Sequence, residues 1–78
     1  MPTVLIWRGY KFRFYALDDG EPAHIHVFKD GKSIKVWLAT MEIAINHGYN
    51  KREIALIMDV VLQNREKWTE QWNEFFGI

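Results

Sequence analysis

The sequence predicts an α+β fold: a small antiparallel sheet of about four strands, followed by a short helix and a long C-terminal helix packed on one face. In the first half, apolar and polar residues alternate with a period of two between turn signals, which is typical of half-buried strands. In the second half, apolar residues recur every three or four positions, which is typical of an amphipathic helix. The 78 residues leave room for one domain, residues 1–78, with one core.

The turn signals divide the first half of the chain into strands. Arg8-Gly9 fits a hairpin turn, and Pro22 has no backbone N–H for a ladder, so a strand begins after it. Asp30-Gly31 between two alternating segments is a strong hairpin signal. We therefore expect strands over residues 3–7, 10–16, 23–28 and 33–38.

A two-residue turn at Asp30-Gly31 also fixes the register of the last two strands. The pairs are Lys29 with Lys32, Phe28 with Ser33, Val27 with Ile34, His26 with Lys35, Ile25 with Val36, and His24 with Trp37. The aliphatic residues then share one face, which we expect to be the core face. The two histidines, a lysine and an indole share the other face.

The period changes after residue 38. Thr40 can cap a short helix over residues 41–47, with Gly48 as its stop. His47 would then lie at the C-terminus of that helix, where a cationic side chain complements the helix dipole.

A long helix is expected over residues 51–75. Asn50 followed by Glu53 resembles a capping box at its start. The helix would be roughly 35–40 Å long at 1.5 Å per residue, which is longer than a four-stranded sheet needs.

Composition excludes several classes of protein. The chain has no cysteine, so it contains neither a disulfide nor a thiolate zinc site. Ten basic and ten acidic residues give no net charge, which argues against a generic binder of nucleic acid. Gly-rich phosphate loops and the Gly-x-Ser-x-Gly and His-Glu-x-x-His motifs are absent. With no signal peptide or long apolar run, we expect a cytoplasmic protein without a membrane span.

His24 and His26 are the most informative residues, because a strand places both rings on one face. Three interpretations stay open. The pair can bind a metal, with Asp18, Asp19, Glu21 or His47 completing the ligand set. It can perform acid–base catalysis on a phosphodiester, with a cation such as Lys35, Arg13 or Lys11 stabilising charge. It can also be structural, or form part of an interface.

Two aromatic groups are candidates for binding. Lys11, Arg13 and Tyr15 share a face of the second strand, and with Lys35 and Trp37 they could form a basic, aromatic platform for RNA. A solvated sheet face is the alternative. The aromatic end of the long helix could form a core, or an exposed patch that binds a partner or a second copy of the chain. Its residues are Trp68, Trp72, Phe75 and Phe76.

The chain resembles the small bacterial family catalogued as domain of unknown function 4160. The resemblance covers nearly the whole length. It rests on the segments Met1–Leu5, Gly9–Tyr15, Gly20–Val27, Lys35–Leu38, Asn64–Arg65 and Trp72–Gly77. The Gly-Glu-Pro-x-His-x-His-Val segment is the distinctive one; this chain has Ala23 where the family usually has a second proline.

The resemblance implies a partner-binding protein. Members are often encoded beside another small protein, in pairs that look like toxin–antitoxin modules. We therefore expect a component of such a two-protein module, with a cognate small protein as partner. If the chain is the toxin, RNA is its expected target, and the site residues would be Glu21, His24, His26 and Lys35. The alternatives are a non-enzymatic interaction module, and a small metal-binding protein that uses His24 and His26.

Overall fold

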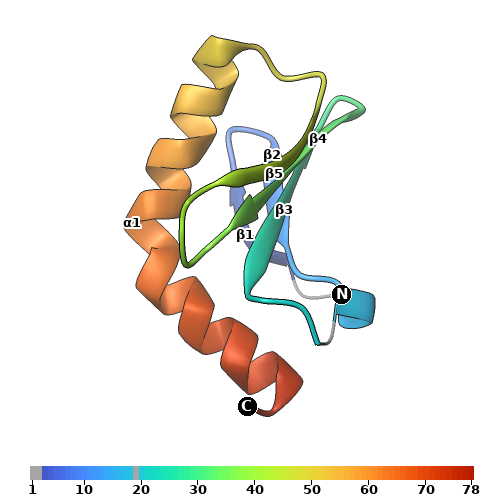
Figure 1. Ribbon diagram of the computed structural model, residues 1–78. Coiled ribbons are helices and arrows are strands. Elements are labelled where there is room, and N and C mark those ends of the chain that lie inside the picture. Colours follow the sequence, from blue (N-terminus) through green and yellow to red (C-terminus); the bar gives the residue numbers. More distant parts are fainter. Residues whose placement is uncertain (1–2, 19) are drawn as a thin grey trace.

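The computed structural model describes residues 3–18 and 20–78. It contains a five-stranded antiparallel sheet and one long helix (Figure 1). The elements are β1 (Thr3–Trp7), β2 (Tyr10–Arg13), the 3-10 helix η1 (Ala16–Asp18), β3 (His24–Lys29), β4 (Lys32–Trp37), β5 (Ile43–His47) and α1 (Lys51–Phe76). Each strand pairs with the next along the chain, so the sheet is a meander in the order β1-β2-β3-β4-β5. The predicted α+β class is confirmed.

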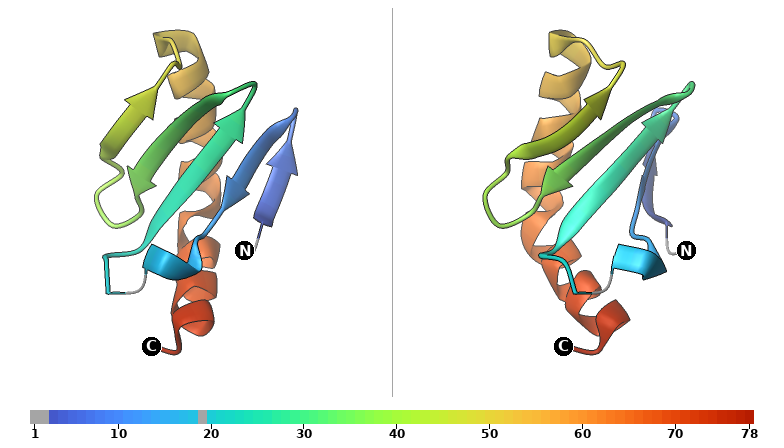
Figure 2. Two further views of the ribbon diagram at one scale, coloured as in Figure 1. Left: turned by 90° about the vertical axis from the view of Figure 1, so that its right-hand side faces the viewer. Right: turned by 45° about the vertical axis from the view of Figure 1, so that its right-hand side comes forward.

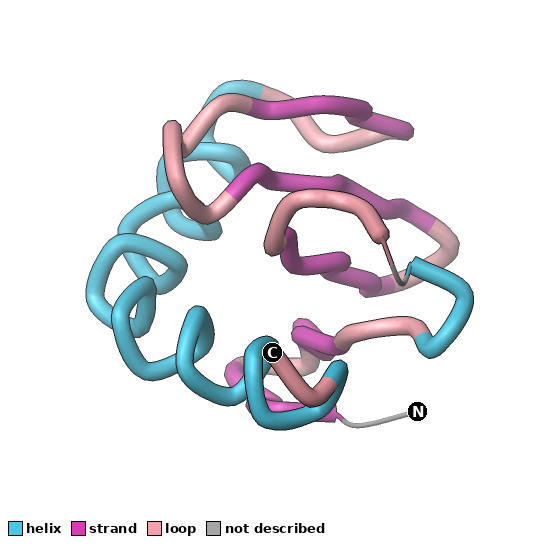
Figure 3. Tube along the Cα trace, turned by 60° about the horizontal axis from the view of Figure 1, so that its bottom comes forward, coloured by secondary structure: helices cyan, strands magenta, loops and turns pink. Residues whose placement is uncertain are grey.

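The helix covers one face of the sheet and leaves the other face open. In Figure 2, α1 runs behind the strands, and η1 lies in front of the lower end of the sheet. Figure 3 shows the same arrangement end-on, with α1 and η1 on opposite sides of the strands. We call the face away from α1 the open face. Its central residues, by strand alternation, are Lys11, Arg13, His26, Phe28, Ser33 and Lys35.

The predicted register of β3 and β4 is confirmed at all six pairs, from Lys29↔Lys32 to His24↔Trp37. Asp30 and Gly31 both have positive φ, 51° and 77°, as this type of tight hairpin turn requires. The turn therefore decides which side chains share the open face.

The short helix expected over residues 41–47 is wrong, because this segment forms β5 and pairs with β4. The Thr40 hydroxyl accepts from the backbone N–H of Glu42, two residues on, and so stabilises a tight turn. A seven-residue helix has little stability of its own, whereas β-branched Ile43 and Ile45 suit a strand that can pair with β4. His47 therefore ends a strand, and its predicted interaction with a helix dipole is also wrong.

The long helix begins directly after Asn50, as the capping signal predicts, and ends at Phe76, one residue past the expected end. The Asn50 side chain accepts from the backbone N–H of Glu53 at 2.9 Å, and Gly77 adopts the left-handed conformation after the last turn. In Figure 1 the C-terminal part of α1 continues past the end of the sheet. Among the described residues, no helix is both long and apolar enough to span a membrane.

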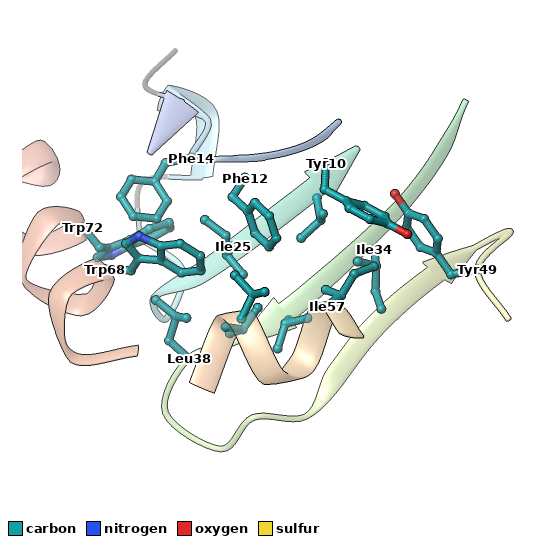
Figure 4. Close-up of a cluster of buried hydrophobic side chains, with 14 residues drawn as sticks. Tyr10, Phe12, Phe14, Ile25, Ile34, Leu38, Tyr49, Ile57, Trp68 and Trp72 are labelled. Atoms are coloured by element: carbon teal, nitrogen blue, oxygen red, sulfur yellow. The ribbon is translucent and has the colours of Figure 1, made fainter. Parts of the chain in front are cut away.

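The core lies between α1 and the sheet and is rich in aromatic rings (Figure 4). Phe12 packs against Trp68 with ring centroids 5.3 Å apart, and Phe14 meets Trp72 edge-on at the same distance. Both tryptophans are 1% exposed. The aromatic end of α1 thus closes the lower end of the core.

Candidate functional site

A carboxylate and two imidazoles meet at the start of β3. The link after β2 forms η1, and this turn brings Asp18 over the open face at the first residues of β3. The Oδ2 atom of Asp18 lies 2.8 Å from Nε2 of His24 and 2.9 Å from Nε2 of His26. Nδ1 of His24 lies 2.9 Å from the Pro22 carbonyl oxygen. We call Asp18, His24 and His26 the Asp-His-His cluster.

The two histidines differ in their access to solvent. The His24 side chain is 0% exposed, and the His26 side chain is 18% exposed. The two histidines share one face of β3 as expected, but the sequence did not predict that His24 is buried there. Trp37 and Trp72 cover its ring, with centroids 5.2 and 4.8 Å away. The overhanging end of α1 reaches round the end of the sheet and buries a residue that strand alternation alone would leave outside the core.

Burial and hydrogen bonding set the charges of the cluster. Burial alone would raise the pKa of Asp18, but hydrogen bonds from His26 and His24, with the charges of both rings, hold it below its ordinary value. Burial lowers the pKa of His26 below its ordinary value; its hydrogen bond to Asp18 and the Asp18 charge oppose this, whereas His24 and Lys35 add to it. At neutral pH, Asp18 is therefore ionised and His26 is neutral.

Two cations flank His26 across the sheet. Arg13 on β2 is its cross-strand neighbour on one side, and Lys35 on β4 is its neighbour on the other. We call Arg13, His26 and Lys35 the central row. Nε of Arg13 is buried without an acceptor among the residues that the structure describes. Lys35 donates to Glu21 at 2.8 Å and lies over the Trp37 ring, 4.6 Å from its centroid.

Most of the predicted site residues gather round this row. Glu21 holds Lys35, and Tyr15 places its ring edge-on to His26 with centroids 4.6 Å apart. Lys11 is exposed on the same face, two residues before Arg13 on β2. The structure thus brings together the basic and aromatic residues that the sequence assigns to one platform.

The aromatic end of α1, in contrast, is mostly buried. Trp68 and Trp72 are core residues, so a partner cannot contact them in the folded protein. Phe76 is half-buried against Trp72, with ring centroids 4.4 Å apart. Of this predicted patch, Phe75 is the large side chain that stays exposed.

Sequence reasoning did not place Phe28 at the site and treated Asp18 only as one of several metal-ligand candidates. Phe28 stacks beside His26 with centroids 6.2 Å apart, and its place two residues along the same strand was the available signal. The acidic turn upstream of the histidines was the signal for Asp18, but the sequence could not tell which carboxylate would reach them.

The Asp-His-His cluster also has the composition of a metal site. One ligand atom from each residue lies within 4.8 Å of the other two. The Pro22 carbonyl accepts from Nδ1–H of His24, which leaves Nε2 directed at the cluster, as the outer hydrogen bond of a metal-bound histidine does. Two of the other predicted ligands do not join the cluster. Glu21 pairs with Lys35, and His47, on β5, lies opposite Ser33 of β4. Asp19 is outside the described residues.

A family model matches most of the chain. Residues 9–73 match the family described as "Domain of unknown function (DUF4160)", and this span contains the cluster, the central row and most of α1. Neither the curated proteins nor the solved structures gave a match. Because the match covers most of the 78 residues, the chain belongs to the family described as domain of unknown function DUF4160.

Proposed function

We propose that the chain is the RNA-directed toxin of a bacterial two-protein module of toxin–antitoxin type, acting in the cytoplasm through His26. The observation that carries this proposal is the central row, in which a histidine held by Asp18 lies between Arg13 and Lys35 on the open face. A base between two cations suits a phosphodiester, because the substrate is anionic and its negative charge increases in the transition state.

His26 is the general base in this proposal. When Nε2 donates to Asp18, the neutral ring carries its lone pair on Nδ1. The lowered pKa of His26 keeps that lone pair available at neutral pH. Nδ1 takes the proton of the ribose 2′-hydroxyl, the 2′-oxygen attacks the adjacent phosphorus, and the 5′-oxygen leaves with a proton from water. The products are a 2′,3′-cyclic phosphate and a 5′-hydroxyl.

Arg13 and Lys35 stabilise the phosphoryl oxygens. The position of Arg13 supports this role, because it is the cross-strand neighbour of His26 and its guanidinium lies over the Phe28 ring on the open face. Glu21 is a positioning residue, since its ion pair holds Lys35 beside the row. His24 is also a positioning residue, because its fully buried ring is hydrogen-bonded to the Asp18 carboxylate and holds it in place.

Growth of a bacterial host with the chain induced alone tests the proposal. We expect arrest by the wild type and none by His26→Ala. Lys51→Ala, at an exposed position in the first turn of α1, is a matched control that still arrests growth. The single variant is preferable to a His24/His26 double variant, because removing the fully buried His24 ring leaves a cavity beneath Trp72. Arrest by a folded His26→Ala protein contradicts the catalytic role. No arrest by any chain contradicts the toxin role and favours a non-enzymatic interaction module.

A metal-binding protein is the second candidate, and the hydrogen bonds of His24 favour it. Nδ1 of this buried residue faces the Pro22 carbonyl and Nε2 faces the Asp18 carboxylate, which is the orientation of a histidine whose outer nitrogen is held while the inner one binds a metal. A divalent cation at the cluster would have three ligand atoms, one each from His24, Asp18 and His26. Equilibrium dialysis against Zn²⁺, Ni²⁺, Mn²⁺ and Fe²⁺ decides between the candidates. One equivalent bound by the wild type and lost in Asp18→Asn supports the metal site, and no stoichiometric binding rejects it.

A further inference from the structure

We infer that a basic pocket beside Phe28 binds the nucleotide next to the phosphate at His26; this inference rests on the RNA-directed function proposed above. The pocket has a volume of about 430 Å³ and lies between the β1–β2 and β3–β4 turns. The two turns are side by side because β2 pairs with β3, and Figure 2 shows their tips close together at the upper end of the sheet.

The lining of the pocket is suited to an anion. Lys11, Lys29 and Lys32 line it, against one carboxylate, that of Asp30. Glu53 neutralises Lys32 at 3.2 Å, and Lys29 lies at the rim over the buried Tyr10 ring. Among the described lining residues, Lys11 is therefore the cation without an ion pair on the same face as Phe28. The ammonium of Lys29 lies 4.4 Å from the centroid of the Tyr10 ring, which fixes its position.

Gly9 leaves room for the Lys29 side chain at the rim of the pocket. Gly9 has φ of 84°, and a Cβ there would lie 3.3 Å from Cε of Lys29. A larger residue would therefore strain the turn and push the Lys29 side chain away. The lack of a side chain at Gly9 therefore lets Lys29 pack against the backbone of the β1–β2 turn.

Phe28 connects the pocket to the central row. It lines the pocket, and its ring is nearly parallel to that of His26, at 16° with centroids 6.2 Å apart. The guanidinium of Arg13 lies 5.7 Å from the centroid of the Phe28 ring. An aromatic ring in this position can stack an unpaired base.

The spacing along the strands suits successive nucleotides. Lys11 precedes Arg13 by two residues on β2, and Phe28 follows His26 by two residues on β3. Each step is about 7 Å along a strand, a distance that one nucleotide unit can span. A phosphate at the central row therefore places the neighbouring base over Phe28 and its phosphate near Lys11.

Binding of a fluorescent single-stranded pentaribonucleotide to the His26→Ala protein, which cannot cleave it, tests the pocket. We expect Phe28→Leu to weaken binding about 10-fold or more, because it removes the ring and keeps an apolar side chain. We expect Lys11→Ala to weaken binding and to reduce the slope of log K against log salt by about 1. Phe28→Leu should leave that slope unchanged, and Lys51→Ala should leave both quantities unchanged.

The outcomes separate the pocket from the proposed function. If the wild type cleaves RNA but neither Phe28→Leu nor Lys11→Ala weakens binding, the pocket assignment is overturned and the proposed function stands. If the wild type does not cleave RNA and the His26→Ala protein does not bind the oligonucleotide, both are overturned.

Discussion

Oδ2 of Asp18 lies 2.9 Å from Nε2 of His26, and this contact links a turn before β3 to the middle of the open face. The carboxylate accepts the hydrogen of one ring nitrogen, so the lone pair is on the other. The same arrangement orients the histidine in other acid–base sites. The proposed chemistry therefore depends on Asp18 as much as on His26.

Replacing Asp18 by Asn tests this dependence. Asn keeps the size of the side chain but loses the charge, and the Asp18 carboxylate is what opposes the effect of burial on His26. We expect the pKa of His26 to fall further, as measured by NMR titration of its ring protons. RNA cleavage should fall roughly 10²- to 10⁴-fold. An unchanged rate in a folded Asp18→Asn protein would show that Asp18 does not position the base.

Acid should destabilise the fold in two stages. The pKa of His26 is below 6.5 in the folded chain, so the unfolded chain binds more protons once the pH falls through 6.5. The pKa of Asp18 is below 3.8 in the folded chain, so a second loss of stability begins near that pH. Urea unfolding from pH 8 to pH 3 measures both stages. His26→Gln should remove the first stage, and a His26→Gln curve that matches the wild type would reject this account.

Alkaline pH should also destabilise the fold. Burial, helped by the nearby Tyr10 and Glu53, raises the pKa of Tyr49 to about 12, and burial likewise raises the pKa of Tyr10. The unfolded chain therefore loses phenolic protons from pH 10 upward, and stability falls as the pH rises through this range. Thermal unfolding between pH 9 and pH 12 measures the fall. Tyr49→Phe should reduce its steepness, and equal steepness in the two proteins would contradict the assignment.

Trp72 should be essential for stability. Its ring contacts His24, Phe14 and Phe76 and is almost fully buried. We expect Trp72→Ala to lower the free energy of unfolding by about 3–5 kcal/mol, a large share of the stability of so small a domain. Leu62→Ala, at a position 58% exposed, should change it by no more than about 0.5 kcal/mol. Similar losses in the two variants would mean that Trp72 is not a core residue in solution.

Local signals in the sequence predicted much of the fold. The Asp30-Gly31 turn gave the β3–β4 register, and Asn50 gave the start of α1. The strand β5 was missed because residues 41–47 have both helix and strand signals, and pairing with β4 decides between them. The secondary-structure preference of a short segment carries no information about its pairing with another strand.

The candidate site was predicted only in part, for the same physical reason. Alternation placed His24 and His26 on one face, which the pairing of β3 with β4 confirms. The burial of His24 depends on Trp72, which is 48 positions later in the sequence. The pocket beside Phe28 likewise depends on two turns that meet through the pairing of β2 with β3. Contacts between distant segments have no local signature in the sequence.

The most direct test of the account is cleavage of an end-labelled single-stranded RNA by the purified wild-type chain, beside His26→Ala and Lys51→Ala. We predict cleavage by the wild type and Lys51→Ala, a loss of roughly 10²-fold or more in His26→Ala, and no cleavage of a DNA strand of the same sequence, which lacks the 2′-hydroxyl. Chelation of divalent metal should leave the wild-type rate unchanged. Intact RNA with the wild type, or equal cleavage by a folded His26→Ala protein, would contradict the claim that His26 acts on RNA.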